Sequence, residues 1–119
     1  MPAKNGASAK FHLRLDRGTE PAIGPGKVAL LEAIEKTGSI SAAARELGMS
    51  YRRAWGLIAD LNRVLVEPAV EAVVGGKDGG RATLSSTGRK VARLYRAIER
   101  DATRHTAAAT RSLLNLVAK

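Results

Sequence analysis

The stretch that decides the fold is residues 37–55, which read TGSISAAARELGMSYRRAW. Its run of alanines predicts a short helix over residues 40–47, which Gly48 ends. A second helix is expected to begin at Ser50, because a serine hydroxyl can accept a hydrogen bond from a free N–H of the first helical turn. Two short helices joined by so tight a turn predict a helix-turn-helix.

The second helix is predicted to continue to about residue 66, since Pro68 prevents it from going further. When successive residues are placed about 100° apart, the helix has one aliphatic face that suits a core. The opposite face carries Arg52, Arg53, Gly56 and Arg63. Such a helix can enter the major groove of DNA, with its N-terminal residues nearest the base edges.

Arginine and glycine suit this role for different reasons. The planar fork of arginine can bond both acceptors of a guanine or clamp a phosphate. A glycine permits close approach, although it costs about 1 kcal/mol of helix stability relative to alanine. Ser39 and Ser41, which compete as the N-cap of the first helix, are also expected to contact DNA. We expect DNA contacts from Ser39, Ser41, Ser50, Tyr51, Arg52, Arg53, Gly56, Arg63, Lys77 and Arg81.

A hairpin is predicted over residues 69–84. Two short apolar strands flank residues 75–80, which read GGKDGG and are too rich in glycine to be anything but a turn. Lys77 and Arg81 lie beside these glycines, where they suit contact with phosphates or with the minor groove. The hairpin is therefore the expected wing of a winged helix-turn-helix.

The segment before these elements is predicted to hold a strand, a loop and a helix. Residues 11–16 alternate between apolar and polar side chains, as a half-buried strand does. Residues 17–25 contain two glycines and two prolines, which predicts a loop, and a helix is expected over residues 25–37. We expect residues 1–9 to be disordered, which leaves residues 10–119 as one domain.

A long last helix is predicted over residues 85–118. Its mostly apolar row recurs at alternating spacings of four and three, the heptad pattern of a coiled coil. One small subunit offers too little surface to cover so long an amphipathic helix, so we expect a homodimer. The expected dimer interface comprises Val91, Tyr95, Ile98, Ala102, His105 and Ala109.

The net charge of +9 is concentrated towards the C-terminus: residues 1–79 contribute +2 and residues 80–119 contribute +7. Such an excess favours a polyanionic partner, with nucleic acid ahead of a membrane surface. We therefore expect double-stranded DNA as the partner. Two alternatives stay open, a membrane-surface module that uses the last helix and a non-specific nucleoid or RNA-binding protein.

An enzyme is not expected. The absence of cysteine excludes disulfides, thiolate metal sites and cysteine nucleophiles. The two histidines, His12 and His105, have no catalytic partner in a recognisable motif, so neither a metal nor a cofactor is expected. No apolar run is long enough to span a membrane, and residues 1–10 lack the apolar core of a secretory signal. We expect a cytoplasmic, nucleoid-associated protein.

The expected fold is mainly α with a small β-hairpin: a winged helix-turn-helix with a long C-terminal dimerisation helix. Residues 37–44, residues 47–55 and the wing at residues 75–84 resemble the N-terminal DNA-binding domain of ModE-type molybdate-responsive regulators. That domain is related to the winged helix of LysR-type regulators. The resemblance covers about residues 11–100.

The resemblance implies a sequence-specific transcriptional regulator that acts as a homodimer on a roughly palindromic operator, with a link to molybdenum metabolism. It also implies that the helix beginning at Ser50 reads the operator, while the wing contacts its flank. Members of the family sense molybdate in C-terminal domains that follow the DNA-binding domain. Because the chain ends at Lys119, we expect a stand-alone form that lacks these domains, which leaves molybdate binding in doubt.

Overall fold

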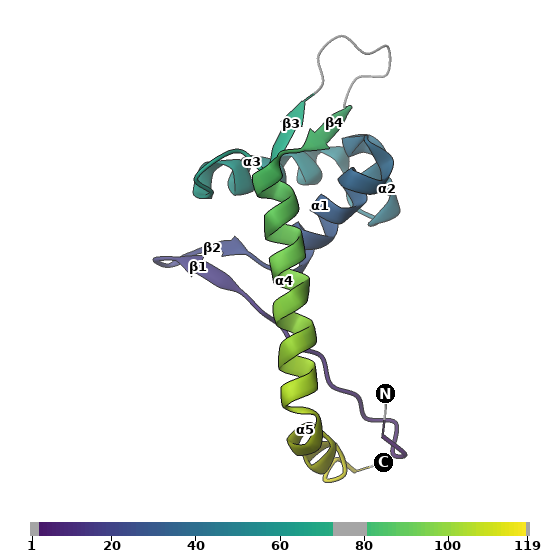
Figure 1. The fold of residues 1–119 in the computed structure, drawn as a ribbon. Coiled ribbons are helices and arrows are strands. Elements are labelled where there is room, and N and C mark those ends of the chain that lie inside the picture. The colour runs from purple at the N-terminus through teal and green to yellow at the C-terminus, as the bar shows by residue number, and fades with distance from the viewer. Residues whose placement is uncertain (1–2, 73–80, 119) are drawn as a thin grey trace.

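The computed structural model describes residues 3–72 and 81–118. Its elements, in chain order, are β1 (Leu15–Arg17), β2 (Glu20–Ile23), α1 (Pro25–Thr37), α2 (Ile40–Glu46), α3 (Tyr51–Val64), β3 (Val70–Ala72), β4 (Ala82–Leu84), α4 (Ser86–His105) and α5 (Ala107–Leu114). Helices α1, α2 and α3 form a head below the β3–β4 hairpin, and α4 extends from it as an arm that ends in α5 (Figure 1). The predicted fold class, a winged helix-turn-helix with a long C-terminal helix, is confirmed.

The core of the head is aliphatic, as a chain with few aromatic residues requires. The helices expected over residues 25–37, 40–47 and 50–66 are present as α1, α2 and α3, to within two residues at each end. Burying one large aliphatic side chain contributes about 1.5–3 kcal/mol, so this core fixes how the three helices sit together. Its largest fully buried side chains are Val28, Leu30, Leu31, Ile34, Ile40, Ile58 and Leu61.

The turn between α2 and α3 is held by a glycine and by two serine caps. Gly48 adopts a φ of +68°, in the left-handed region that favours glycine. The N–H of Met49 then donates to the carbonyl of Ala44 at 2.9 Å. The hydroxyls of Ser39 and Ser50 accept N–H groups from the first turns of α2 and α3, at 3.1 and 3.0 Å. These contacts fix where α3 begins.

The strands of the wing pair antiparallel, with Val70 opposite Leu84 and Ala72 opposite Ala82. Both strands fall within the hairpin predicted over residues 69–84. The glycine-rich turn that we predicted at residues 75–80 lies outside the described residues.

Both strands of the wing are fastened to the head. The side-chain amide of Asn62 in α3 holds β3, since its Oδ1 accepts the N–H of Ala69 at 2.8 Å and its Nδ2 donates to the carbonyl of Val70 at 3.2 Å. On the other strand, the N–H of Ala82 donates to the carbonyl of Gly38 at 3.1 Å. The base of the wing is therefore positioned by α3 and by the turn before α2.

The segment before α1 differs from the prediction of a strand over residues 11–16 and a loop over residues 17–25. The structure has a hairpin, β1–β2, that reverses at Gly18, whose φ is +63°. Glycine and proline predict a loop by composition, yet Gly18 is the residue that lets the chain turn back and pair. Residues 11–14 form no strand, although Leu13 packs against the core.

The last helix is broken, whereas the sequence predicts a continuous one over residues 85–118. The break is at Thr106, which lies between α4 and α5 and has a φ of −106° and a ψ of 8°. Its hydroxyl donates to the carbonyl of Ala102 at 2.6 Å, and hydroxyl bonds of this kind bend helices. The heptad row therefore does not continue along one straight helix.

Residues 3–9, which the sequence predicts to be disordered, run beside α5 in the structure. The side-chain Nδ2 of Asn5 donates to the carbonyl of Leu114 at 2.9 Å and also to that of Val117. Carbonyls at the end of a helix lack partners within the helix, so Asn5 supplies one. Residues 3–9 therefore lie close to the end of α5 at the foot of the arm (Figure 1).

Candidate nucleic-acid interface

The two faces of α3 are separated as the sequence predicts. The residues buried on its inner face are Ala54, Ile58 and Leu61. Arg52 and Arg53 are exposed on the outer face, and neither forms an ion pair within the described part of the chain. A Cβ built at Gly56 would meet no other atom within 4 Å, so this face is also open. The first half of α3 thus offers two free guanidinium groups beside a position without a side chain.

An aromatic pair borders this face. Tyr51 and Trp55 lie one helical turn apart, with their ring centroids 6.2 Å from each other and their planes at 84°. Both remain exposed, to 44% and 37%. Tyr51 was among the predicted DNA contacts, whereas the sequence analysis did not select Trp55. The spacing of four residues on a helix is the signal that could have found it.

The base of the wing meets the start of α2. Arg81 is exposed, and its backbone forms an antiparallel bridge with Ser39. Ser39 and Ser41 are both half-buried, and the hydroxyl of Ser39, like that of Ser50, is engaged as a helix cap. Arg81 therefore joins the neighbourhood of the helix-turn-helix, while Lys77 lies outside the described residues.

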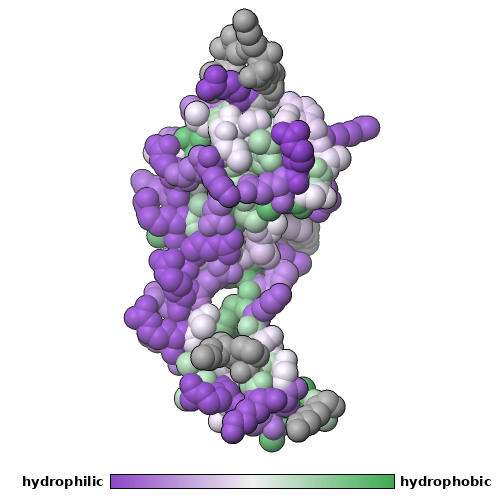
Figure 2. Space-filling model, turned by 90° about the vertical axis from the view of Figure 1, so that its right-hand side faces the viewer, coloured by the Kyte–Doolittle hydropathy of each residue, from purple (hydrophilic) through white to green (hydrophobic). Residues whose placement is uncertain are grey.

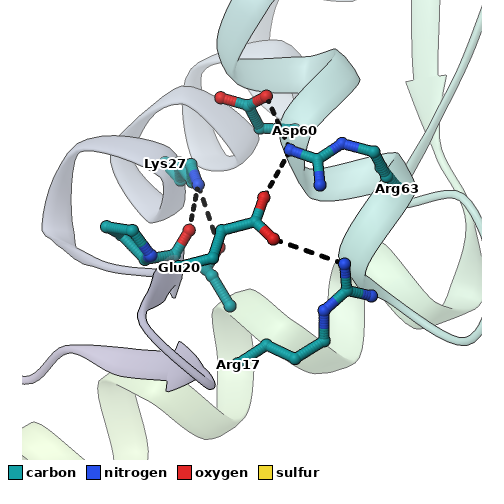
Figure 3. Close-up of polar contacts among 7 residues, drawn as sticks. Arg17, Glu20, Lys27, Asp60 and Arg63 are labelled. Atoms are coloured by element: carbon teal, nitrogen blue, oxygen red, sulfur yellow. Dashed lines mark hydrogen bonds and ion pairs between the residues drawn. The ribbon is translucent and has the colours of Figure 1, made fainter.

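Arg63 lies at the far end of α3, about 18 Å along its axis from the start of the helix. Its guanidinium bonds Glu20 at 2.5 Å and Asp60 at 3.2 Å (Figure 3). Glu20 also meets Arg17 at 3.3 Å, and the hydrogen bond from Arg63 lowers the pKa of this carboxyl. Arg63 therefore fastens the β1–β2 hairpin to α3 and is not brought together with the other predicted contacts.

A basic face runs along α4, where hydrophilic residues form a nearly continuous column (left side of Figure 2). Its exposed arginines include Arg93, Arg100 and Arg104. Arg96 is different, because it bonds Glu32 of α1 at 2.7 Å and Glu99 at 2.7 Å. These hydrogen bonds raise the pKa of Arg96. Part of the positive charge thus holds α4 against α1, and the rest faces solvent.

The upper part of the predicted dimer row faces its own subunit. Tyr95 is buried, and its hydroxyl donates to the carbonyl of Leu13 at 2.7 Å. Burial also raises the pKa of this phenol. Val91 packs against the same core. A heptad row and a core-facing stripe have nearly the same period, so the sequence could not tell the two apart here.

The lower part of the row is open. Ile98, His105 and Ala109 are exposed, and Ala102 is half-buried. Leu94, which the sequence analysis did not select, is 59% exposed one turn before Ile98. The exposed apolar stripe of α4 is therefore displaced from the predicted row by one residue at its upper end.

The arm is also hollowed where the N-terminal segment meets it. Two open hollows of ≈ 770 and ≈ 860 Å³ lie between residues 3–12 and the α4–α5 arm, and Phe11 and Thr103 line both. Among the residues that the structure describes, no three His, Asp or Glu side chains gather to hold a metal ion. Over the same residues, no helix is both long and apolar enough to cross a membrane.

Residues 26–89 match the model of the family described as bacterial regulatory helix-turn-helix protein, lysR family. The matched segment runs from the first turn of α1 to the first turn of α4. It therefore contains the helix-turn-helix and both strands of the wing.

The chain is 52% identical over 77 residues to the molybdenum-pterin-binding protein MopB of Rhodobacter capsulatus. This matched segment covers 65% of this chain and 28% of MopB. It is 42% identical over 91 residues to the molybdenum transport protein ModE of Azotobacter vinelandii, covering 76% and 33%. It is 39% identical over 71 residues to the DNA-binding transcriptional dual regulator ModE of Escherichia coli K12, covering 60% and 27%. The chain thus spans about a third or less of these relatives, and the predicted resemblance to ModE-type regulators is confirmed.

Proposed function

Because the chain belongs to the lysR family of bacterial regulatory helix-turn-helix proteins, we propose that it is a sequence-specific DNA-binding regulator that acts as a homodimer on a roughly palindromic operator. The observation that carries the proposal is the outer face of α3. Arg52 and Arg53 are exposed there beside the open position of Gly56. In this proposal the chain binds DNA and catalyses no reaction, and it works in the cytoplasm at the nucleoid.

The first half of α3 has the chemistry of a major-groove reader. Arginine can donate two parallel hydrogen bonds to O6 and N7 of one guanine, which no other base pair accepts in the same way. Arg52 and Arg53 form no ion pair with the rest of the described chain, and Gly56 lets the backbone approach the groove. The caps at Ser39 and Ser50 position the helix and stay engaged while it reads.

The wing supplies contacts that do not read sequence. Arg81 projects from the base of the wing beside the start of α2, where a phosphate also meets the positive end of a helix dipole. We assign the same role to Lys77. Such contacts fix the register of the protein on the duplex, while α3 distinguishes one base pair from another.

The arm supplies the dimer. Leu94 and Ile98 are exposed to 59% and 49% on a helix that no other part of the described chain covers on that side. His105 and Ala109 continue the open surface towards α5. Pairing two arms would bury this stripe and would place two copies of α3 on two half-sites, which is why the operator is expected to be roughly palindromic.

The names of the relatives suggest the target genes. MopB is named for binding molybdenum-pterin and the Azotobacter ModE for molybdenum transport. We propose that this chain regulates genes for the uptake or use of molybdenum. Molybdate binding by these 119 residues is not part of the proposal.

The test is a selection of duplexes from random sequence with the purified chain, followed by affinity measurements in a salt series. A palindrome should be enriched, and Arg52→Ala and Arg53→Ala should each weaken binding to it by about 1–3 kcal/mol and relax its sequence preference. Arg100→Ala on α4 is the matched control, because it removes the same charge outside α3 and the wing, and it should leave the sequence preference unchanged. Equal affinity for random and selected DNA at every salt concentration would make the chain a non-specific nucleoid protein.

A further inference from the structure

Trp55 is the single tryptophan of the chain, and it is exposed on the surface that we assign to DNA. The chain has four aromatic residues in all, which are Phe11, Tyr51, Trp55 and Tyr95. Half of them are thus placed on one edge of α3. Tryptophan contributes most when its large apolar surface is covered, so an exposed tryptophan beside the exposed Arg52 indicates a surface that a partner covers.

The contacts of Trp55 hold its ring at the border of the reading face. Tyr51 packs edge-to-face against it, with the centroids 6.2 Å apart. At about 100° per residue, Trp55 lies some 60° around the helix from Arg52 and 100° from Gly56. The ring therefore borders the arginine-bearing face and does not belong to the core. Because α3 is not part of the arm that we assign to the dimer, pairing of two arms does not account for the exposed ring.

The chemistry of an indole restricts what it can read in the major groove. Its N–H is a donor only, so it cannot accept the amino groups that adenine and cytosine present there. The apolar feature of the groove is the 5-methyl group of thymine, which apolar side chains contact. An aromatic edge beside Arg52 thus complements it, because arginine selects guanine and an apolar ring selects thymine.

We propose that Trp55 is a specificity-determining residue that contacts thymine 5-methyl groups in the operator, with Tyr51 holding the ring in place. The inference rests on the proposed function, since it requires that α3 enters the major groove. It adds a second class of base to those that the arginines can read. It also assigns the role to a residue that neither caps a helix nor forms part of the buried core.

The test replaces thymine by deoxyuridine, which removes the methyl group and leaves the hydrogen-bonding pattern unchanged. In the selected operator, the substitution should weaken binding of the wild-type chain by about fourfold for each contacted methyl, the effect expected for burying one methylene equivalent. For Trp55→Ala the two duplexes should bind equally. Trp55→Phe should keep most of the preference for thymine, because an apolar ring is retained.

Val66→Ala is the matched control, because Val66 is also a large apolar residue that is exposed, to 95%, but it follows the far end of α3. This variant should keep the wild-type ratio of the two affinities. Thermal unfolding of each variant establishes that it is folded. Quenching of the single tryptophan by acrylamide should also decrease when the operator is bound.

The outcomes separate the two claims. If Trp55→Ala binds a preferred sequence and keeps the wild-type ratio between thymine and uracil duplexes, the inference is wrong while the proposed function stands. If the wild-type chain binds the thymine and uracil duplexes with equal affinity, the inference is likewise wrong while the proposed function stands. If no sequence is preferred at all, the proposed function fails and this inference fails with it.

Discussion

Gly56 and Gly88 both lie within helices, and the structure gives them opposite reasons to lack a side chain. A Cβ at Gly88 would lie 2.2 Å from the carbonyl oxygen of Ala69, a backbone atom that cannot move aside. A Cβ at Gly56 would meet nothing within 4 Å. We expect Gly88→Ala to lower the free energy of unfolding by about 1–3 kcal/mol or more, and Gly56→Ala to raise it by about 1 kcal/mol, both measured by urea denaturation.

DNA binding should change in the opposite sense for Gly56→Ala. If the backbone of α3 approaches the groove at this position, the added methyl group weakens operator binding in a protein that has become more stable. Undiminished affinity of Gly56→Ala would mean that close approach is not the reason for this glycine. Gly26→Ala near the start of α1 serves as the control, since a Cβ there also meets nothing within 4 Å and the residue lies outside the helix-turn-helix of α2 and α3.

At the scale of elements, one side chain of α3 carries much of the attachment of the wing. Asn62 accepts the N–H of Ala69 and donates to the carbonyl of Val70. Truncation leaves both backbone groups without these partners, at a cost of about 1–3 kcal/mol each when they are buried. Asn62→Ala should therefore destabilise the domain by about 2–3 kcal/mol in urea denaturation. An effect no larger than that of exposed Ser112→Ala would contradict this account.

The β1–β2 hairpin is attached to α3 through Glu20, whose pKa is lowered by the hydrogen bond from Arg63 and, to a smaller extent, by Arg17. A carboxyl with a lowered pKa in the folded state stabilises it above the ordinary pKa, and this contribution is lost as the pH falls through the lowered value. Arg63→Ala should raise the Glu20 pKa towards its ordinary value in an NMR titration of the side-chain carboxyl. Arg17→Ala should produce a smaller shift.

Operator binding gives this pair a second readout. Because the guanidinium of Arg63 already bonds two carboxylates, Arg63→Ala should weaken operator binding less than Arg52→Ala does. A Glu20 pKa that is as low in Arg63→Ala as in the wild type would show that Arg63 is not the main cause of the lowering.

The elements that the sequence predicts well are those with a local signal. Gly48 and Ser50 define the turn and the start of α3, and hydrophobic periodicity gives the inner face of this helix. The β1–β2 hairpin was missed because its pairing depends on how Gly18 reverses the chain, which composition does not reveal. The break at Thr106 was missed because heptad spacing continues through it.

In the candidate site, too, the features with a local sequence signal were predicted and the others were not. Periodicity correctly placed Arg52, Arg53 and Gly56 on the outer face of α3, since that depends on one helix alone. It could not reveal that Arg63 is engaged by Glu20 or that Tyr95 lies in the core, because both facts depend on segments far away in the sequence. Residue faces can be predicted locally, whereas partners across the fold cannot.

At the scale of the whole molecule, a head and an arm are joined by core packing of Ala92 and Tyr95 and by an ion pair between α4 and α1. The structure measures 55 × 29 × 23 Å, and its long dimension follows α4. Arg96 bonds Glu32 with two nitrogens, at 3.0 and 2.7 Å, which fixes the direction of α4 relative to α1. In a dimer joined through its arms, this contact would set the separation of the two reading helices, and half-sites one DNA turn apart require about 34 Å.

The dimer itself is tested by placing a charge on the exposed stripe of the arm. Ile98 is 49% exposed in the single chain, so Ile98→Glu should leave the fold intact while a carboxylate opposes pairing of two arms. Light scattering at micromolar concentration should give a dimer for the wild type and a monomer for the variant. The variant should lose most of its affinity for the palindrome and keep its affinity for a single half-site, because α3 is untouched.

Val66→Glu, which alters another exposed apolar residue beyond α3, should remain dimeric. If Ile98→Glu also remains dimeric, the subunits associate through another surface, and the hollow between residues 3–12 and the arm is then the next surface to test.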